Sequence, residues 1–545
     1  MRLKKLYIVA VAALCLQACN MDESPYTAGS DMSETPAGAS QMVNSIYNVF
    51  WSTGLMKKAY MECIDMDHDH AAAPTWVVSG AGEGNITTHW SYNTSSDPFN
   101  AFYRMISRAN YAIENIPLVP SIEDSERDYF MGEAYFLRAF AYFHLVRMYG
   151  PVPLRLKFDI SSDMARARVL DVYKQIEDDL LLAADKMPWG TAMNQWGRTN
   201  KTAAKLLLAK VYATVASSSL AGSVDLLVNI KGELKKIPTN KIDGFEGVDT
   251  KEYYDKVKKI CDEIIAQRGS FYDLRASFSS IWGNQNARNN EFVWGVAGSN
   301  QLEFTTEHLG YYYSAIPYNG RGWAGISEHA YQLYEGDDER GEHGIFHYIK
   351  QSFTSTGSYV RIPNNPAKYP VGPDGKPTRG VDNYYNTIFI TKWYLGDVVN
   401  PTPVTQDPGY ALQPQDIPLI RFVDAYLLRA EALAELNQFS EALADLNVVR
   451  NRAKANEYNS GLTLEQLRSY ILNERALEYM QEFNRKFDLL RWGAYLNVMN
   501  NTGTIRVQGS GLTISKIREP RSILYAAPLN EINNNKLFGP NNIGW

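Results

Sequence analysis

The sequence predicts a mostly α-helical protein built on tetratricopeptide-like helix pairs and interrupted by a long, loop-rich part. Two observations predict this fold. Apolar residues recur three and four positions apart in the first half of the chain and again after residue 420, which is typical of helices that bury one face. Between these regions, residues 271–418 are rich in Gly, Asn, Pro and aromatic residues and contain only short β-like runs. Because aromatic residues are so frequent there, we expect ordered loops rather than disorder.

The chain begins with a segment that has the composition of a targeting signal. Basic residues precede an apolar run over residues 6–16, which is too short to span a bilayer, so residues 1–18 are expected to form a signal peptide. The tetrapeptide Leu16-Gln-Ala-Cys19 resembles a bacterial lipobox, in which the cysteine becomes the lipidated first residue of the mature chain. We therefore expect Cys19 to anchor the protein to a membrane through lipid, with an ordinary secretory signal as the alternative. Residues 19–40 are rich in small and polar residues and predict a flexible tether.

Composition and charge exclude several classes of protein. The chain has 545 residues, with 54 Lys and Arg against 60 Asp and Glu, for a net charge of −6. Removal of the signal takes away three basic and no acidic residues, so the mature chain carries −9 and offers no overall basic surface to nucleic acid. The single apolar run excludes a polytopic membrane protein. Only Cys63 and Cys261 would remain as thiols, either in one disulfide or as two buried free cysteines.

The apolar periodicity places the helices and arranges them in pairs. Helices are expected over residues 99–116, 125–149, 171–187, 202–217, 253–267, 422–436, 440–455, 464–483 and 486–499. Small residues mark the faces of three pairs, at about 125–187, 202–267 and 422–455. The third pair fits the later small-and-large spacing of a tetratricopeptide unit, in which small residues let paired helices approach closely. The matching residues are Ala430, Asn437, Phe439, Ala442 and Leu446. Generic helical hairpins are the alternative.

Three longer blocks of sequence carry a family resemblance. The first runs from Gly132 to Leu154 and contains Glu-Ala-Tyr-Phe-Leu-Arg and Tyr-Gly-Pro-Val-Pro-Leu. The second joins Leu428-Arg-Ala-Glu-Ala432 to the Asn-Val-Val-Arg-Asn-Arg-Ala run at 447–453, and the third runs from Glu474 to Gly493. Asp338-Glu-Arg340 is a shorter match, while the C-terminal seven residues vary the usual ending. In order and spacing, these blocks resemble the SusD/RagB-like outer-membrane lipoproteins over almost the whole mature chain.

The resemblance implies both a fold and a function. It implies one SusD-like domain over residues 41–545, with a helical scaffold at about 41–270 and 420–500 and a ligand-facing, loop-rich part at about 271–418 packed on one side. It implies a lipoprotein on the extracellular face of the outer membrane that binds oligosaccharide or polysaccharide. It also implies a partner, a SusC-like TonB-dependent β-barrel transporter, over which the lipoprotein sits as a lid. Asp22 and Glu23 resemble the acidic surface-export signal of such lipoproteins, with a solvated tether as the alternative.

Arginines in the family blocks are expected to be structural. They are Arg138, Arg429, Arg450, Arg475 and Arg491, and each lies on a helix with a strong apolar face. Carboxylates such as Glu133, Glu431 and Glu478 lie nearby, so these arginines are expected to join neighbouring helices rather than to bind ligand.

The loop-rich part contains the best candidate binding residues. The segment 309–323 concentrates five aromatic rings, which are Tyr311, Tyr312, Tyr313, Tyr318 and Trp323. Sugars stack their C–H faces on aromatic rings, while their hydroxyls need planar polar groups such as Asn319 and Arg321 at the rim. Glycines at 310, 320 and 322 permit the turns that such a loop requires. We predict that Trp323 contributes most to glycan binding, whereas some of the tyrosines fill the loop's own small core.

A second aromatic segment lies earlier in the chain. Trp76, Trp90 and Tyr92 occur among Gly, Thr and Asn residues. In the family that the chain resembles, this early loop also contributes to the glycan platform, so the three residues are included in the predicted site. Trp282 and Trp294, which flank strand-like runs, are expected in the core instead.

The sequence offers one candidate metal cluster. Asp65-Met-Asp-His-Asp-His70 contains ligand types for a divalent ion, but without regular ligand spacing, so a solvated acidic loop is favoured. His343 and His347 lack the intervening Glu of a zinc-protease helix. No cofactor is therefore expected, and Ca²⁺ binding stays open.

The sequence thus predicts a glycan-binding protein that performs no chemical step. There is neither a phosphate-binding glycine loop nor a Gly-x-Ser-x-Gly nucleophile motif, and no catalytic residue is assigned. Two alternatives remain. A lipid-anchored glycoside hydrolase would need only a suitably spaced carboxylate pair, and a tetratricopeptide-like scaffold also suits a peptide-binding adaptor.

Overall fold

The computed structural model describes most of the chain. The described residues are 35–52, 55–56, 58–73, 92–161, 163–191, 195–298, 307–315, 318, 320, 322–349, 360–361, 388–402, 416–506 and 513–545. The expected signal peptide and Cys19 lie outside these ranges, as does the expected tether up to residue 34. Its last residues, from Pro36, form the first turn of a helix instead.

Six helices form the three pairs that the sequence predicts. They are α6 (Asp124–Tyr149), α7 (Val169–Lys186), α8 (Lys201–Leu220), α9 (Thr250–Ala266), α13 (Val423–Glu435) and α14 (Phe439–Arg452). α6 packs on α7, α8 on α9, and α13 on α14, while α7 also packs on α8 and α9 on α13. The pairs therefore stack in sequence order, and the long loop-rich part is inserted between the second pair and the third.

Local sequence signals set the ends of these helices. α6 ends at Gly150, whose φ of +71° favours glycine. The Asn200 side chain caps α8 by accepting from the Ala203 N–H at 3.0 Å. Both boundaries lie within a few residues of the predicted ones.

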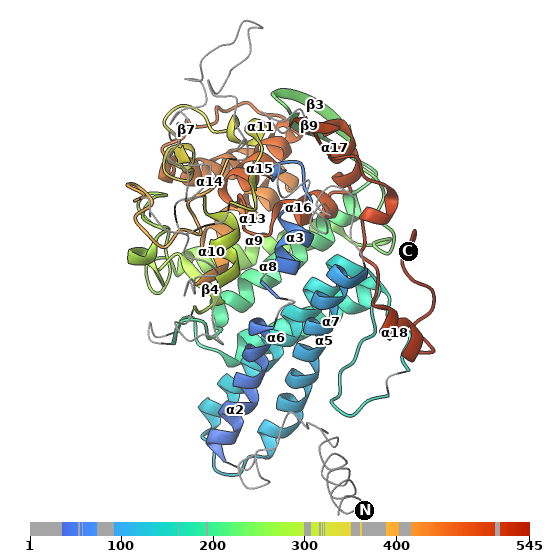
Figure 1. The fold of residues 1–545 in the computed structure, drawn as a ribbon. Coiled ribbons are helices and arrows are strands. Elements are labelled where there is room, and N and C mark those ends of the chain that lie inside the picture. Colours follow the sequence, from blue (N-terminus) through green and yellow to red (C-terminus); the bar gives the residue numbers. More distant parts are fainter. Residues whose placement is uncertain are drawn as a thin grey trace, which may run out of the picture.

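Further helices extend the scaffold at both ends of the chain. They are α2 (Pro36–Tyr47), η1 (Asn48–Trp51), α3 (Lys58–Ile64), α5 (Tyr92–Asn115), η3 (Ile116–Leu118), α15 (Leu464–Glu478), α16 (Arg485–Arg491), α17 (Tyr495–Thr502), η8 (Pro520–Ser522) and α18 (Leu529–Asn534). Figure 1 shows α2, α5, α6 and α7 side by side in the lower half of the molecule, in agreement with their packing contacts. Among the described residues, no helix is both long and apolar enough to cross a membrane.

Strands are short and occur as antiparallel pairs. The pairs are β1 (Ala71–Ala72) with β5 (Gly325–Ile326), β2 (Asp225–Ile230) with β3 (Glu233–Pro238), β4 (Phe292–Val296) with β8 (Ile417–Arg421), β6 (Tyr348–Ile349) with β7 (Val360–Arg361), and β9 (Thr504–Arg506) with β10 (Thr513–Ser515). A Cβ on Gly295 would lie 2.1 Å from the Ile417 carbonyl oxygen, so the close approach of β4 and β8 requires glycine there. The β1–β5 pair joins the segment after α3 to the loop-rich part.

The loop-rich part adds short helices on one side of the scaffold. These are η5 (Asn284–Asn286), α10 (Glu307–Tyr313), α11 (Glu328–Tyr331) and α12 (Glu339–Glu342). In Figure 1, α10 and α11 lie in the upper half of the molecule, as do α13 and α14, whereas α2 and α5 lie in the lower half. The chain is therefore a mostly α-helical scaffold with irregular segments on one side, as predicted.

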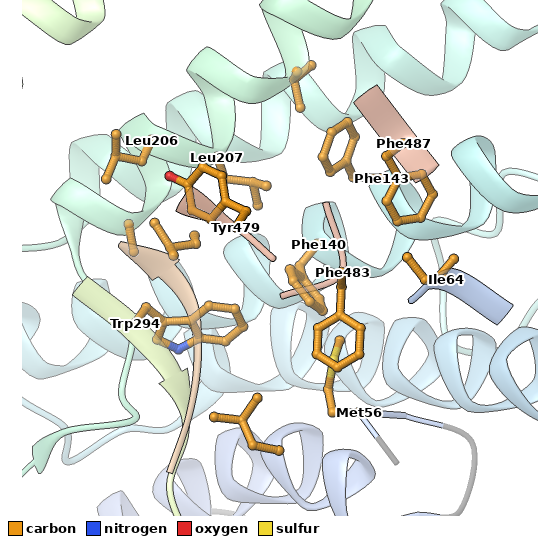
Figure 2. Close-up of a cluster of buried hydrophobic side chains, with 14 of the residues drawn as sticks. Met56, Ile64, Phe140, Phe143, Leu206, Leu207, Trp294, Tyr479, Phe483 and Phe487 are labelled. Carbon is orange, nitrogen blue, oxygen red and sulfur yellow. The ribbon is translucent and has the colours of Figure 1, made fainter. Parts of the chain in front are cut away.

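An aromatic cluster in the core joins the scaffold to the loop-rich part (Figure 2). The Trp294 ring of β4 meets the rings of Phe136 and Phe140 on α6 at 4.7 and 5.1 Å between centroids, both edge to face. Trp294 is fully buried and Trp282 is 3 % exposed, which confirms that both belong to the core. Burying such rings is a major contribution to stability.

Buried ion pairs also join separate parts of the chain. All five arginines predicted to be structural pair with carboxylates. The pairs are Arg138 with Asp179, Arg429 with Asp445, Arg450 with Glu474, Arg475 with Asp488, and Arg491 with Glu431. A larger group surrounds Glu478 of α15, whose carboxylate accepts from Arg452 at 2.6 Å and from Arg421 of β8 at 2.8 Å. These contacts hold β8 against the repeat helices.

The two described cysteines are free thiols. Cys63 and Cys261 are both buried and unpaired with each other. Of the two alternatives that the sequence left open, the structure therefore has two buried free cysteines.

Candidate functional site

The predicted aromatic segment folds as a short helix followed by a tight return. Its three consecutive tyrosines end α10, and the Gly322 N–H then donates to the Ser314 carbonyl at 2.9 Å. A Cβ on Gly320 would lie 1.9 Å from that same oxygen, and Gly322 has a φ of +62°. Both positions therefore require glycine. Their effect is to bring Trp323 back against the tyrosines of α10.

Trp323 and Tyr312 form a ring pair at the end of this return. The Trp323 N–H donates to the Tyr312 carbonyl at 2.8 Å, and the two ring centroids lie 5.2 Å apart at 71°. Tyr311 lies edge-on to Tyr312, with 5.6 Å between centroids. Trp323 is 8 % exposed and Tyr311 and Tyr312 are each 5 % exposed. Trp323 is thus the most exposed of the five predicted rings, although only its margin reaches the surface.

The remaining two rings pack within the protein. Tyr313 is fully buried, stacks on Trp393 at 5.7 Å between centroids, and donates its hydroxyl to the Asp65 carboxylate at 2.8 Å. Tyr318 is 2 % exposed and stacks on Phe346 at 4.5 Å. Some of these tyrosines are expected from the sequence to fill the loop's own core, and Tyr313 and Tyr318 have the contacts of such residues.

Other predicted site residues lie outside the described part of the chain. They are Trp76, Trp90, Asn319 and Arg321. Tyr92 is the first residue of α5, but its side chain is likewise outside the description. Their part in binding stays a prediction.

The acidic segment 65–70 is not a solvated loop, so this expectation from the sequence was wrong. Its three aspartates are each no more than 1 % exposed, and its two histidines are no more than 2 % exposed. Each aspartate has specific partners: the Tyr313 hydroxyl and Phe483 N–H for Asp65, Lys486 and Arg518 for Asp67, and Arg485 for Asp69. The cations that neutralise Asp67 and Asp69 come from a distant part of the sequence, which is why no local pattern revealed them.

Burial controls protonation in this segment. Burial raises the pKa of Asp65 to about 7, although hydrogen bonds from Tyr313 and Phe483 act in the opposite direction. Burial also lowers the pKa of His68 to about 3, with the nearby Asp69 carboxylate opposing the shift. Within the described residues, no group of three or more His, Cys, Asp or Glu side chains is arranged to hold a metal ion. The segment is instead part of the protein interior, where Asp65 contacts α10 through the hydrogen bond from Tyr313.

A separate cavity lies where α2 and η1 meet the turn before α8 and the end of β4. Seven residues between Gln41 and Trp51 line it together with residues 196–198 and 295–297, and two of the lining residues are tryptophans. The signal available in the sequence was the run Asn48-Val-Phe-Trp51, which places an amide and an indole within one turn.

Two family models match the chain. Residues 264–545, just over half of it, match the SusD family, and residues 21–213 match a family described as starch-binding and associating with the outer membrane. Among curated proteins, SusD-like protein P25 of Formosa agariphila is 25 % identical over 422 residues, covering 74 % of this chain and 72 % of the relative.

Solved structures share the fold over nearly the full length. A SusD homolog from Bacteroides thetaiotaomicron superposes with a TM-score of 0.73 at 18 % identity, covering 96 % of this chain and all of the other. A structure described as a laminarin-binding SusD-like protein gives a TM-score of 0.65 at 22 % identity, covering 93 % and 99 % of the two chains.

Proposed function

Because the chain belongs to the SusD family, we propose that it is a cell-surface glycan-binding lipoprotein. It captures an oligosaccharide or polysaccharide outside the cell and passes it to a SusC-like TonB-dependent transporter for uptake. Lipid on Cys19 holds it on the extracellular face of the outer membrane. The protein recognises the shape of its ligand and carries out no chemical step.

One observation carries the binding part of this proposal. The Tyr312–Trp323 pair is held by backbone hydrogen bonds and by two obligatory glycines, so its rings are oriented before ligand arrives. An aromatic ring of fixed orientation suits contact with a sugar's C–H groups, and the exposed margin of Trp323 is where that contact would be made. A relative described as laminarin-binding and a matching family described as starch-binding support a glycan as the ligand.

The expected effect of removing the indole is large. Trp323→Ala should weaken glycan binding about tenfold or more, because truncation of a buried tryptophan contact typically costs more than about 1.4 kcal/mol of binding free energy. Affinity electrophoresis in gels containing laminarin, starch or other polysaccharides measures this change. Tyr311→Ala with Tyr312→Ala should have a comparable effect, whereas Tyr313 is left intact because it pairs with Asp65 in the core.

The matched control is Trp189→Ala, which removes a half-buried indole packed beside the Lys201 and Lys205 ammonium groups. Its electrophoretic retardation should equal that of the unmodified protein. Equal retardation of Trp323→Ala by a glycan that binds would contradict the assignment of the aromatic segment. New reducing ends released from a bound polysaccharide by the purified protein would instead indicate a glycoside hydrolase.

A further inference from the structure

The cavity beside α2 has a volume of about 510 Å³ and shares no lining residue with the tyrosine-rich segment. We name it the α2 cavity and define it by its seven lining residues between Gln41 and Trp51 together with residues 196–198 and 295–297. Three separate parts of the chain therefore form its walls: the corner between α2 and η1, the turn before α8, and the end of β4.

The apolar floor of the α2 cavity is anchored to the core. Phe50 is 3 % exposed and meets Trp294 edge to face at 5.9 Å between ring centroids. The Trp294 indole N–H donates to the Gly197 carbonyl at 3.0 Å, which ties the second wall to the same ring. Trp294 is one of the core side chains shown in Figure 2. The floor is consequently rigid.

Two partly exposed indoles stand above this floor. Trp51 ends η1, and Trp196 belongs to the turn before α8. The Trp196 N–H donates to the Phe292 carbonyl at 3.3 Å, which fixes the orientation of its ring. Both indoles are partly exposed, whereas no ring of the tyrosine-rich segment is more than 8 % exposed.

Amide side chains form the rim of the α2 cavity. Gln41, Asn44 and Asn48 are exposed and follow one another at helical spacing, so they share one face of α2 and its extension. Asn44 accepts from the Arg198 guanidinium at 2.6 Å, and Arg198 also pairs with the buried Glu133. The Arg198 guanidinium is thus engaged by Glu133 and Asn44, and the exposed rim residues Gln41, Asn44 and Asn48 are neutral.

We infer that the α2 cavity is a second saccharide-binding site, which takes a neutral sugar ring of a glycan. The indoles suit the C–H face of such a ring, and planar amides suit its hydroxyls. An anionic ligand would need an uncommitted cation, whereas Arg198 is paired with Glu133. A purely apolar ligand would make no hydrogen bonds with the amide side chains of the rim. The choice of a glycan as ligand rests on the proposed function. The identification of the α2 cavity as a binding site does not, because it rests on the residues that line the cavity.

Isothermal titration calorimetry tests this inference. The ligand is an oligosaccharide prepared from whichever of laminarin or starch retards the protein in affinity electrophoresis. The unmodified protein should bind two molecules per chain, and Trp196→Ala should bind one. Asn48→Leu changes only an exposed rim residue, so it should leave thermal unfolding unaltered and weaken the second site about fivefold, as expected for one lost hydrogen bond. Trp189→Ala is again the control.

The outcomes separate this inference from the proposed function. Loss of one site in Trp196→Ala, with the other lost in Trp323→Ala, supports both. A single site that requires Trp323 and is unaltered in Trp196→Ala and Asn48→Leu overturns the inference and leaves the proposed function intact. A single site that requires Trp196 but not Trp323 supports the α2 cavity and contradicts the aromatic segment. Failure of every glycan to bind overturns both.

Discussion

Replacing Glu478 by Gln is expected to lower the free energy of unfolding by about 3–5 kcal/mol, the usual result of removing one member of a buried ion pair. Glu478 is fully buried and accepts from Arg421 and Arg452 through one carboxylate oxygen, with Arg340 3.4 Å from the other. Burial alone raises the pKa of Glu478, but the three guanidinium groups lower it well below its usual range. Glutamine retains the shape and removes one negative charge from the buried cluster. The arginines keep other carboxylate partners, such as Glu291 and Glu482, but the cluster then carries one positive charge more than before.

Chemical denaturation followed by circular dichroism measures this loss. Glu252→Gln provides the matched control, because Glu252 is 59 % exposed and pairs with Lys256 one helical turn away at 2.8 Å. An exposed pair of this kind contributes less than about 1 kcal/mol. Equal losses in the two variants would show that the buried cluster has no special role in stability. Because the cluster joins β8 and α12 to α15, Glu478→Gln should also loosen the loop-rich part.

The second large effect is expected from His68. Below neutral pH, this buried histidine should lower the free energy of unfolding of the protein. His68 is 1 % exposed, and its Nδ1 accepts the N–H of His70 at 3.2 Å. Protonation of Nδ1 would remove this acceptor in a buried site. His68→Asn keeps an acceptor in a similar position and removes the titration. The free energy of unfolding of the unmodified protein should therefore fall relative to that of His68→Asn as the solution is acidified.

The sign follows from the proton balance. Burial lowers the pKa of His68 from 6.5 to about 3, so the unfolded chain takes up a proton below about pH 6.5 while the folded protein does not. Each pH unit below that point costs the folded state about 1.4 kcal/mol per histidine. Asp65 and Glu133 act in the opposite direction, because burial raises the pKa of each to about 7 and the folded protein protonates them first. The unmodified protein and His68→Asn both contain Asp65 and Glu133, so the difference between the two proteins does not include the contribution of these carboxyl groups.

Urea denaturation at pH 7 and at pH 5 measures this change. The difference in free energy of unfolding between the unmodified protein and His68→Asn should shift by about 2 kcal/mol in favour of the variant at pH 5. His343→Asn, at a partly exposed turn, controls for the substitution itself. A difference that is the same at both pH values would show that His68 protonates equally in the folded and unfolded chains. Asp69 and Asp67 raise the pKa of His68 and would account for such a result, whereas Lys516 and Arg485 lower it.

The helix pairs could be predicted from the sequence because their signals are local. Apolar spacing, small residues and end signals such as Gly150 all lie within one or two turns of the helix they describe. The β2–β3 hairpin was missed although its signal was present. Leu226, Val228 and Ile230 alternate with less buried residues, and Lys231-Gly232 supplies the positive φ angles of its turn.

Other features depend on contacts that no local pattern contains. The expected helix over 486–499 is divided at Gly493, where an added Cβ would lie 2.1 Å from the Asn240 carbonyl oxygen. The tyrosine-rich segment could be located, but the burial of Tyr313 and Tyr318 depends on Trp393 and Phe346, which come from other loops. The α2 cavity could not be predicted, since its walls come from three separate parts of the chain.

The buried aspartates of residues 65–70 also constrain the order in which the protein can form. Asp69 pairs with Arg485, and Asp67 with Lys486 and Arg518, across more than 400 residues of sequence. During synthesis the acidic residues emerge long before the cations that neutralise them. A chain that ends before residue 485 would have to bury these charges unpaired, which costs several kcal/mol for each. The N-terminal segment therefore reaches its native environment only when the C-terminal helices are present, and closing so long a loop makes folding slow.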